Sequence, residues 1–229
     1  MYNYKKLFHD FLLGSFCVLC RETQSIRLRL AGLKTSIRQA HMTKAYDEIR
    51  FHGRGGQGIV TASALLAQAF FYEGRYPQSV PVYGPQRRGA PVTVFLRVAD
   101  QKIYQRSWIY NPKYVVILDG SLIKITDVTQ GVPKDGLILV NTPYTNREAL
   151  GLGCSFQVAG VDADEIAYRL GLGGPPYPRI NTLMIAAFAK VTGLVSLETV
   201  IRAAKERFPP KDDRMESGMR EAYERVLLL

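Results

Sequence analysis

Two short runs of consecutive apolar residues constrain the fold of this chain more than any other feature. They are residues 114–118 (YVVIL), which stop at Asp119, and residues 136–140 (GLILV), which stop at Asn141. Strands that are apolar at every position are buried on both faces, which is typical of parallel sheets beneath helices. Parallel strands need crossover connections, and these are usually helices. The runs therefore predict an α/β fold.

Segments with strand or helix periodicity surround these two runs. The other strands are expected at residues 46–52, 78–83, 91–98 and 155–159. Helices are expected at residues 57–72, 162–170, 181–192, 196–208 and 213–228. This order predicts a three-layer α/β/α sandwich with a mostly parallel sheet and a helical C-terminal third.

The first 41 residues differ from the rest of the chain. Seven Lys or Arg against two acidic residues give them half of the formal net charge of +10. Their apolar run, residues 11–20, is too short to span a bilayer. We expect residues 1–41 to be an extension outside a domain that spans residues 42–229, with Met42 as a candidate start. A targeting segment and a partner-binding arm remain alternatives.

Charge and cysteine usage exclude several classes of protein. The remaining positive charge is spread over residues 42–229 without a stripe of basic and aromatic side chains, so we expect no nucleic-acid partner. The three cysteines are Cys17, Cys20 and Cys154, and only the first two form a CxxC pair. They are too few for a disulfide framework, a zinc site or an iron–sulfur cluster. We therefore expect no metal ligands, no membrane partner and a reducing compartment.

A glycine-rich loop, residues 53–58 (GRGGQG), follows the first predicted strand and precedes the first predicted helix. Glycine permits positive φ and close approach by a ligand, and the following helix start favours an anion. Gly55, Gly56, Gln57 and Gly58 are therefore candidate ligand-binding residues. The spacing matches the dinucleotide fingerprint G-x-G-x-x-G, but no acidic residue ends the second strand to bind a ribose. A tight turn without a ligand is the structural alternative.

A second loop, residues 83–91 (YGPQRRGAP), precedes the strand expected at 91–98. Arg87 and Arg88 are suited to phosphate or carboxylate, and Gly89 follows them. We include these three residues in the candidate site. A solvated loop or a salt bridge between subunits is an equally good interpretation of the arginines alone.

Taken together, the two loops resemble a known family. HGRGGQGIVTASALLAQA followed by VYGPQRRGAPV is similar to the gamma subunit, or domain III, of pyruvate and related 2-oxoacid:ferredoxin oxidoreductases. RSWIYNPKYVVILDGSL, GLILVNT and INTLMIAAFAKVTGLVSLETVIRAAKERF continue the similarity in the same order. The resemblance covers roughly residues 46–223 and leaves residues 1–41 outside it.

The resemblance implies a cytoplasmic complex of alpha, beta, gamma and delta subunits. Such complexes convert pyruvate and coenzyme A to acetyl-CoA and CO2 while reducing ferredoxin, or run the reaction in reverse. The family places thiamine diphosphate, Mg and the [4Fe–4S] clusters in other subunits. This chain would then hold no cofactor alone and would be a non-redox subunit. Its two loops would form a wall of the CoA channel or a subunit contact.

Several questions stay open at the level of sequence. The 2-oxoacid and the direction of flux are not indicated, so a 2-oxoisovalerate or other 2-oxoacid enzyme is an alternative. A free-standing dinucleotide-binding reductase is an alternative of another class. His52 is expected to be structural rather than a proton relay. Asp119 either belongs to a site at the strand end or caps the helix that follows. No catalytic residues are identified.

Overall fold

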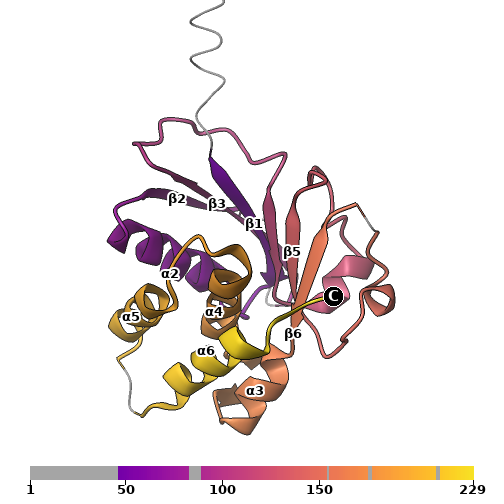
Figure 1. Cartoon of the computed structure of the whole chain (residues 1–229), viewed down its shortest axis with the longest axis vertical. Helices are drawn as coiled ribbons and strands as arrows, with labels where there is room; N and C mark the ends of the chain where they lie inside the picture. Colours follow the sequence, from indigo (N-terminus) through magenta and orange to yellow (C-terminus); the bar gives the residue numbers. More distant parts are fainter. Residues whose placement is uncertain (1–45, 83–88, 154, 175–176, 210–211) are drawn as a thin grey trace, which may run out of the picture. The chain divides into compact units, whose positions relative to one another are not determined.

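A mixed seven-stranded sheet forms the centre of the part of the chain that the computed structural model describes (Figure 1). The described residues are 46–82, 89–153, 155–174, 177–209 and 212–229. They belong to one compact unit that begins at Tyr46. The predicted extension, residues 1–41, lies outside the described residues, so its separation from the domain stays a prediction.

The sheet has the strand order β2-β3-β1-β4-β5-β6-β9. Its strands are β1 (Asp47–Arg54), β2 (Tyr76–Val82), β3 (Pro91–Ala99), β4 (Tyr114–Ile117), β5 (Leu137–Asn141), β6 (Gln157–Val161) and β9 (Leu227–Leu228). A separate two-stranded ribbon pairs β7 (Gly173–Gly174) with β8 (Tyr177–Pro178).

The parallel part of the sheet is its centre. β1 pairs with β4, β4 with β5 and β5 with β6, all in parallel. The apolar runs form β4 and β5, as the sequence predicts. β3 is antiparallel to both β1 and β2, and β9 is antiparallel to β6. The sheet is therefore mixed, because a hairpin and the C-terminus add antiparallel strands to a parallel centre.

All five α-helices in the described residues pack on one face of the sheet (Figure 1). They are α2 (Ile59–Tyr72), α3 (Ala163–Arg169), α4 (Asn181–Thr192), α5 (Leu197–Arg207) and α6 (Arg214–Arg225). α4 is the central helix of this layer, and its residues from Asn181 to Ala189 are all buried. Phe188 of α4 meets the ring of Tyr114 on β4 edge-on, with centroids 5.8 Å apart. The helical C-terminal third is thus confirmed.

The opposite face of the sheet carries no α-helix within the described residues. Its cover consists of the 3-10 helices η1 (Gly120–Lys124) and η2 (Glu148–Leu150) and of loops. These elements bury the alternate side chains of β4 and β5, such as Ile117 and Ile138. The α/β class is confirmed, but the third layer of the predicted sandwich is short turns. The connections after β4 and β5 contain the 3-10 helices η1 and η2 and, among their described residues, no α-helix.

Side-chain caps begin three of the helices. The side chain of Asp162 accepts a hydrogen bond from the backbone of Glu165 at the start of α3. Ser196 does the same for Thr199 at the start of α5. Asp119 accepts from the backbone of Ser121 at the start of η1. Each cap satisfies a backbone donor that the helix itself leaves unpaired.

The prediction of a helix that continues to residue 228 is wrong at its end. α6 stops at Arg225, and Leu227 and Leu228 form β9 against β6. The backbone amide of Leu229 donates to the carbonyl of Val158 at 2.9 Å. The helical periodicity of the C-terminus cannot reveal this pairing, because only the folded sheet exposes the edge of β6.

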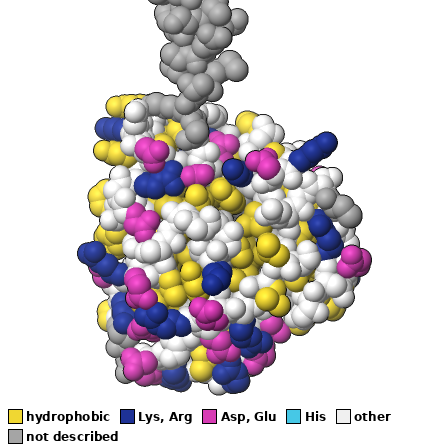
Figure 2. All heavy atoms as spheres, viewed as in Figure 1, with side chains coloured by type: hydrophobic (Ala, Val, Ile, Leu, Met, Phe, Trp, Pro, Cys, Tyr) yellow, Lys and Arg dark blue, Asp and Glu magenta, His cyan; other side chains and the backbone are white. Residues whose placement is uncertain are grey.

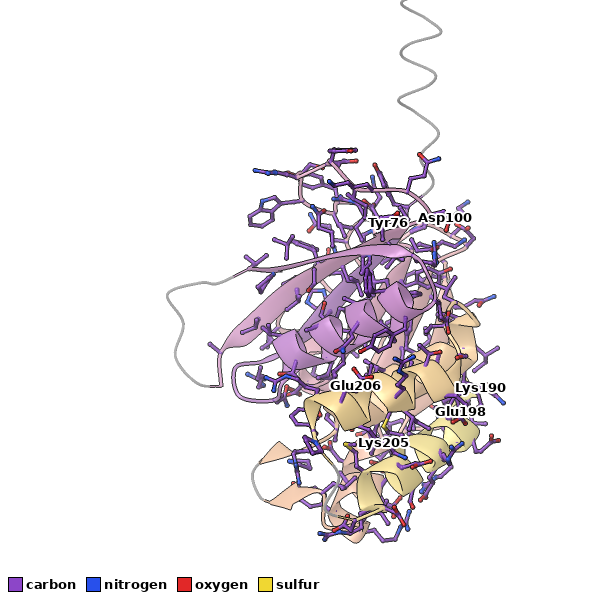
Figure 3. All side chains as sticks on the ribbon, turned by 90° about the vertical axis from the view of Figure 1, so that its left-hand side faces the viewer. Tyr76, Asp100, Lys190, Glu198, Lys205 and Glu206 are labelled. Atoms are coloured by element: carbon purple, nitrogen blue, oxygen red, sulfur yellow. The ribbon has the colours of Figure 1, made fainter. Side chains whose placement is uncertain are left out.

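The outer surface of the helices carries charges of both signs side by side (Figure 2). Arg220 of α6 binds Glu198 of α5 at 2.7 Å and Glu216 at 2.8 Å. Figure 3 labels Glu198 on α5, with Glu206 at the other end of that helix. Glu206 accepts from Gln68 of α2 at 3.2 Å. These cations of the helical face are therefore neutralised by neighbouring carboxylates.

Replacing one buried and one exposed phenylalanine with alanine tests whether the packing of Phe188 between α4 and the sheet stabilises the fold. Phe188→Ala should lower the free energy of unfolding by about 3–5 kcal/mol, because it opens a cavity between α4 and β4. Phe71→Ala is the matched control, since Phe71 is 64% exposed, and should change stability by less than about 0.5 kcal/mol. Urea unfolding followed by circular dichroism measures both. Equal losses would contradict the central position of α4.

Candidate functional site

The carboxyl ends of the parallel strands meet at one edge of the sheet. β1 leads into the glycine loop, β4 into η1, and β6 into α3. Ligands of open α/β sheets bind at such an edge, because the loops and helix starts that follow the strands converge there. The predicted site residues of the glycine loop therefore lie where this architecture places a ligand site.

The glycine loop has a backbone that requires glycine at two positions. Gly56 has φ of 100° and Gly58 has φ of 76°, which lies in the left-handed region. A Cβ at Gly58 would also lie 2.9 Å from Nδ2 of Asn181 at the start of α4. Gly58 thus allows the starts of α2 and α4 to pack closely together.

The start of α2 has no side-chain cap. Gly58 occupies the N-cap position, and no acidic residue lies in the first turn. The first backbone N–H groups of a helix have no partners within the helix and carry partial positive charge. This start therefore suits an anionic group, as the sequence predicts.

The structure brings the two predicted loops together. The amide of Gly55 donates to the carbonyl of Ala90, and the amide of Gly89 donates to the carbonyl of Gly55, both at 2.9 Å. Gly89 has φ of 89°. Arg87 and Arg88 lie outside the described residues. The described end of the second loop, at Gly89 and Ala90, is therefore hydrogen-bonded to the glycine loop.

Arg54, the last residue of β1, ties three segments of this edge together. Its Nε donates to Oδ2 of Asp119 at 2.7 Å. Its Nη2 donates to Oγ of Ser121 at 2.8 Å, and its Nη1 to the carbonyl of Gly89 at 3.1 Å. The guanidinium thus links the end of β1 to η1 and to the second loop.

The other partners of Asp119 and Gln57 complete this network. Oδ1 of Asp119 accepts from Oγ of Ser121 at 2.6 Å. Nε2 of Gln57 lies 3.4 Å from Oδ2 of Asp119, and its Oε1 accepts from the amide of Arg54 at 2.7 Å. Burial alone disfavours the charged form of Asp119, but the hydrogen bonds from Ser121 and Arg54 outweigh it and lower its pKa. Asp119 is therefore an anionic anchor that both caps η1 and holds Arg54.

A pocket of about 440 Å³ lies beside this network, at the ends of β4 and β5. Gln57, Asp119, Asn141 and Asp164 line it together with Tyr168. Nδ2 of Asn141 donates to Asp164 at 2.9 Å, and its Oδ1 accepts from the amide of Ala163 at 3.0 Å. Burial, with the nearby carboxylates of Asp162 and Asp119, raises the pKa of Asp164.

Sequence reasoning did not include Arg54, Asn141 or Asp164 among the site residues. Asn141 has a local signal, because it ends an apolar strand run as Asp119 does. Arg54 has a weaker signal, since it lies inside the glycine loop but could equally face solvent. Asp164 has none, because its contact with Asn141 joins two segments that meet only in the folded sheet.

His52 faces the side of β1 that carries no α-helix, beside Arg50. It is 5% exposed, and its Nε2 has no hydrogen-bond partner among the described residues. Burial, together with the positive charge of Arg50, lowers the pKa of His52 from 6.5 to about 3. The imidazole is neutral at physiological pH, which favours a structural role over a proton relay.

The topology disfavours a dinucleotide site in the glycine loop. In dinucleotide-binding folds, the strand after the first helix lies beside the first strand, and its end binds the ribose. Here α2 leads to β2, which is an edge strand separated from β1 by β3. The match to G-x-G-x-x-G therefore reflects a tight turn and an anion-friendly helix start.

The described part of the chain contains neither a cluster of metal-ligating side chains nor a membrane-spanning helix. No group of three or more His, Cys, Asp or Glu in these residues is arranged to hold a metal ion. None of the described helices is both long and apolar enough to cross a membrane.

Comparison with known proteins identifies the family. A model of the family described as pyruvate ferredoxin/flavodoxin oxidoreductase matches residues 48–224. The chain belongs to this family. The resemblance that the two loops and the later motifs predict is thus confirmed.

Two relatives and one solved structure illustrate the similarity. "Pyruvate synthase subunit PorC" of Methanothermobacter marburgensis is 46% identical over 182 residues, covering 78% of this chain and 97% of that protein. "Pyruvate/ketoisovalerate oxidoreductases common subunit gamma" of Pyrococcus abyssi is 45% identical over 183 residues, with 78% and 96% covered. The crystal structure of pyruvate oxidoreductase subunit PORC from Thermotoga maritima has a TM-score of 0.70 and 34% identity, covering 81% of this chain and 99% of that one.

A pair of glycine variants tests the geometry of the glycine loop. Gly74→Ala should cost about 1 kcal/mol, because Gly74 has φ of 80° but open space around it. Gly58→Ala should cost at least about 1 kcal/mol more, since the new methyl group also presses on Asn181. Urea unfolding of the two variants measures the difference. Equal losses would contradict close packing of the α2 and α4 starts.

The low pKa of His52 predicts that the fold loses stability as the pH falls. Unfolding raises its pKa from about 3 to 6.5, so the unfolded chain binds a proton that the folded chain does not. Below pH 6.5 this site should therefore destabilise the fold progressively, by up to about 1.4 kcal/mol per pH unit. Urea unfolding between pH 7.5 and 5 measures the slope, and His52→Gln should reduce it. An imidazole NMR signal of His52 that titrates near pH 6.5 would refute this prediction.

Proposed function

We propose that this chain is the gamma subunit of a pyruvate:ferredoxin oxidoreductase, also called pyruvate synthase. The observation that carries the proposal is the match to nearly the full length of PorC proteins, 97% of one of them. The complex would convert pyruvate and CoA to acetyl-CoA and CO2 with reduction of ferredoxin. One relative is a subunit common to pyruvate and ketoisovalerate oxidoreductases, so a gamma subunit that serves another 2-oxoacid is the second candidate.

The proposal assigns the redox chemistry to partners. Alpha, beta and delta subunits would hold thiamine diphosphate with Mg and the [4Fe–4S] clusters, and ferredoxin would accept the electrons. When bound there, thiamine diphosphate supplies the carbanion chemistry of decarboxylation. The sparse cysteines of this chain support a non-redox role and a reducing, cytoplasmic setting.

The contribution of this chain would be to bind and orient CoA at the carboxyl edge of the sheet. CoA carries phosphates, and the uncapped start of α2 supplies backbone N–H groups toward such anions. Gly55, Gly56, Gln57 and Gly58 would let the ligand approach the backbone closely. Arg87 and Arg88 would add charge-assisted hydrogen bonds to phosphate or to a partner carboxylate.

The Arg54 network supports this assignment because it holds Gly89, at the described end of the second loop. Arg54 donates to the carbonyl of Gly89 while its Nε is held by Asp119 at 2.7 Å. Gly89 follows Arg88 directly in the sequence. Arg54 and Asp119 are therefore positioning residues, whereas Arg87 and Arg88 are the proposed ligand contacts.

Alanine substitution of the paired arginines tests this role. In the reconstituted complex, Arg87→Ala with Arg88→Ala should raise the KM for CoA by about tenfold or more, because charged contacts to phosphate are lost. Arg202→Ala is the matched control, since Arg202 lies on α5 and pairs locally with Glu206. Steady-state kinetics with varied CoA measures the effect. Unchanged KM together with unchanged assembly would refute the proposed role.

The domain boundary is part of the same proposal. The family match starts at residue 48, and we propose that the native chain starts near Met42, which would leave residues 1–41 outside the functional subunit. Intact-mass measurement of the protein from its natural source tests this. A mass that includes residues 1–41 would refute the proposed start.

A further inference from the structure

We propose that a groove beside Trp108 is the surface on which an acidic partner subunit of the complex docks. The tryptophan groove, as we call it, is formed by Val80 and Pro81 of β2, Phe95 of β3, and Arg106, Trp108 and Ile109 of the following loop. It lies on the sheet face that carries no α-helix and has a volume of about 270 Å³. The inference rests on the proposed function, which supplies the partner subunits.

The groove presents an exposed aromatic anchor. Trp108 is the only tryptophan of the chain and is 57% exposed. Val80, on the opposite wall, is 47% exposed. Exposed apolar side chains that cluster around a concave surface mark interaction sites, and tryptophan and arginine are enriched among the residues that dominate binding energy.

The anchor is held in place before any partner binds. The Trp108 ring rests against Phe95, with centroids 5.7 Å apart and planes tilted by 56°. Nη2 of Arg97 donates to the carbonyl of Ser107 at 3.3 Å, and Arg97 itself is buried against Glu48 at 2.8 Å. A side chain that is already ordered loses little conformational entropy on binding, which raises the affinity that it provides.

The edge strand beside the groove is unsuited to strand addition. β2 is the outer strand of the sheet, and it contains Pro77 and Pro81. Proline has no N–H group, so these positions cannot donate to an added strand. The occupant is therefore expected to dock through side chains in the groove rather than by extending the sheet.

The rim of the groove is basic through Arg106. Within the described residues, Arg106 forms no ion pair, and neither does Lys102, which lies earlier in the same loop. The acidic residue of this loop, Asp100, is held by Arg75 at 3.0 Å. On the helical face, by contrast, cations such as Arg220 have carboxylate partners. Charge complementarity thus calls for carboxylates on the partner, close to an apolar side chain that fills the groove.

The same charge argues against a second copy of this chain as the occupant. A two-fold dimer places the same patch on both subunits. Such a dimer across this groove would bring the basic rims together, with Arg106 of each copy near the other. Like charges at an interface disfavour association. A different subunit with an acidic surface avoids this repulsion.

The single tryptophan provides a direct probe of docking. We would label this chain with 5-fluorotryptophan and record its one 19F resonance alone and after adding unlabelled partner subunits. Docking at the groove predicts a shifted resonance that loses its sensitivity to a soluble paramagnetic quencher. An unmoved, fully quenched resonance in an assembled complex would overturn the proposal.

Substitutions of Trp108 then test how much this side chain contributes to the affinity for the partner subunit. Trp108→Ala should weaken assembly at least about tenfold, whereas Trp108→Phe should restore part of it. Phe71→Ala is the matched control, because Phe71 is also exposed, at 64% against 57% for Trp108, but lies on α2 on the opposite face. Each unlabelled variant is titrated with the partner subunits, and mass photometry measures its affinity for them. Assembly as tight for Trp108→Ala as for Phe71→Ala would contradict the proposal.

A charge reversal tests the acidic character of the partner. Arg106→Glu should weaken assembly and reduce its dependence on salt, and Lys190→Glu on α4 is the control on the helical face. If Arg106→Glu binds as tightly as the control, the proposed charge complementarity is wrong. If the isolated chain dimerises and Trp108→Ala abolishes the dimer, the occupant is a second copy and the proposal fails.

The outcomes separate this inference from the proposed function. An active wild-type complex in which the 19F resonance of Trp108 is unaffected would refute only the proposal that a partner docks at the tryptophan groove. If the wild-type chain neither binds the alpha, beta and delta subunits nor supports CoA-dependent pyruvate oxidation, the proposed function fails, and the groove loses its partner with it.

Discussion

The guanidinium of Arg54 is the contact on which the arrangement of the candidate site depends. It joins the end of β1 to η1 through Asp119 and Ser121, and to the second loop through the carbonyl of Gly89. Asp119 can serve as its anion because hydrogen bonds keep that carboxylate charged despite partial burial. Together with the backbone hydrogen bonds between Gly55, Gly89 and Ala90, this guanidinium holds the glycine loop, the start of η1 and the described end of the second loop together.

The two faces of the sheet are covered in different ways. The helical face buries most of the apolar core around α4 and neutralises its surface charges within and between helices. The opposite face is covered by short turns and loops, and it retains an exposed tryptophan beside Arg106, which forms no ion pair within the described residues. A stable helical layer on one side leaves the other side available for the proposed partner subunit.

Local patterns were sufficient for most of the secondary structure. Apolar runs identify β4 and β5, and side-chain caps at Asp162 and Ser196 locate the starts of α3 and α5. The C-terminal strand β9 escaped prediction. It depends on contacts between segments far apart in the chain, such as Leu229 with Val158, and periodicity within one segment carries no information about them.

The sequence by itself determined the α/β class, the family and the two loops, because these follow from residue patterns that are local and ordered along the chain. Only the tertiary structure decided that Gly55 and Gly89 are hydrogen-bonded partners, that Arg54 is held by Asp119, and that Asn141 and Asp164 line the adjacent pocket. It also showed that β2 lies at the edge of the sheet, which disfavours a dinucleotide site. Strand order and register place these residues together, and both are set by packing of the whole sheet.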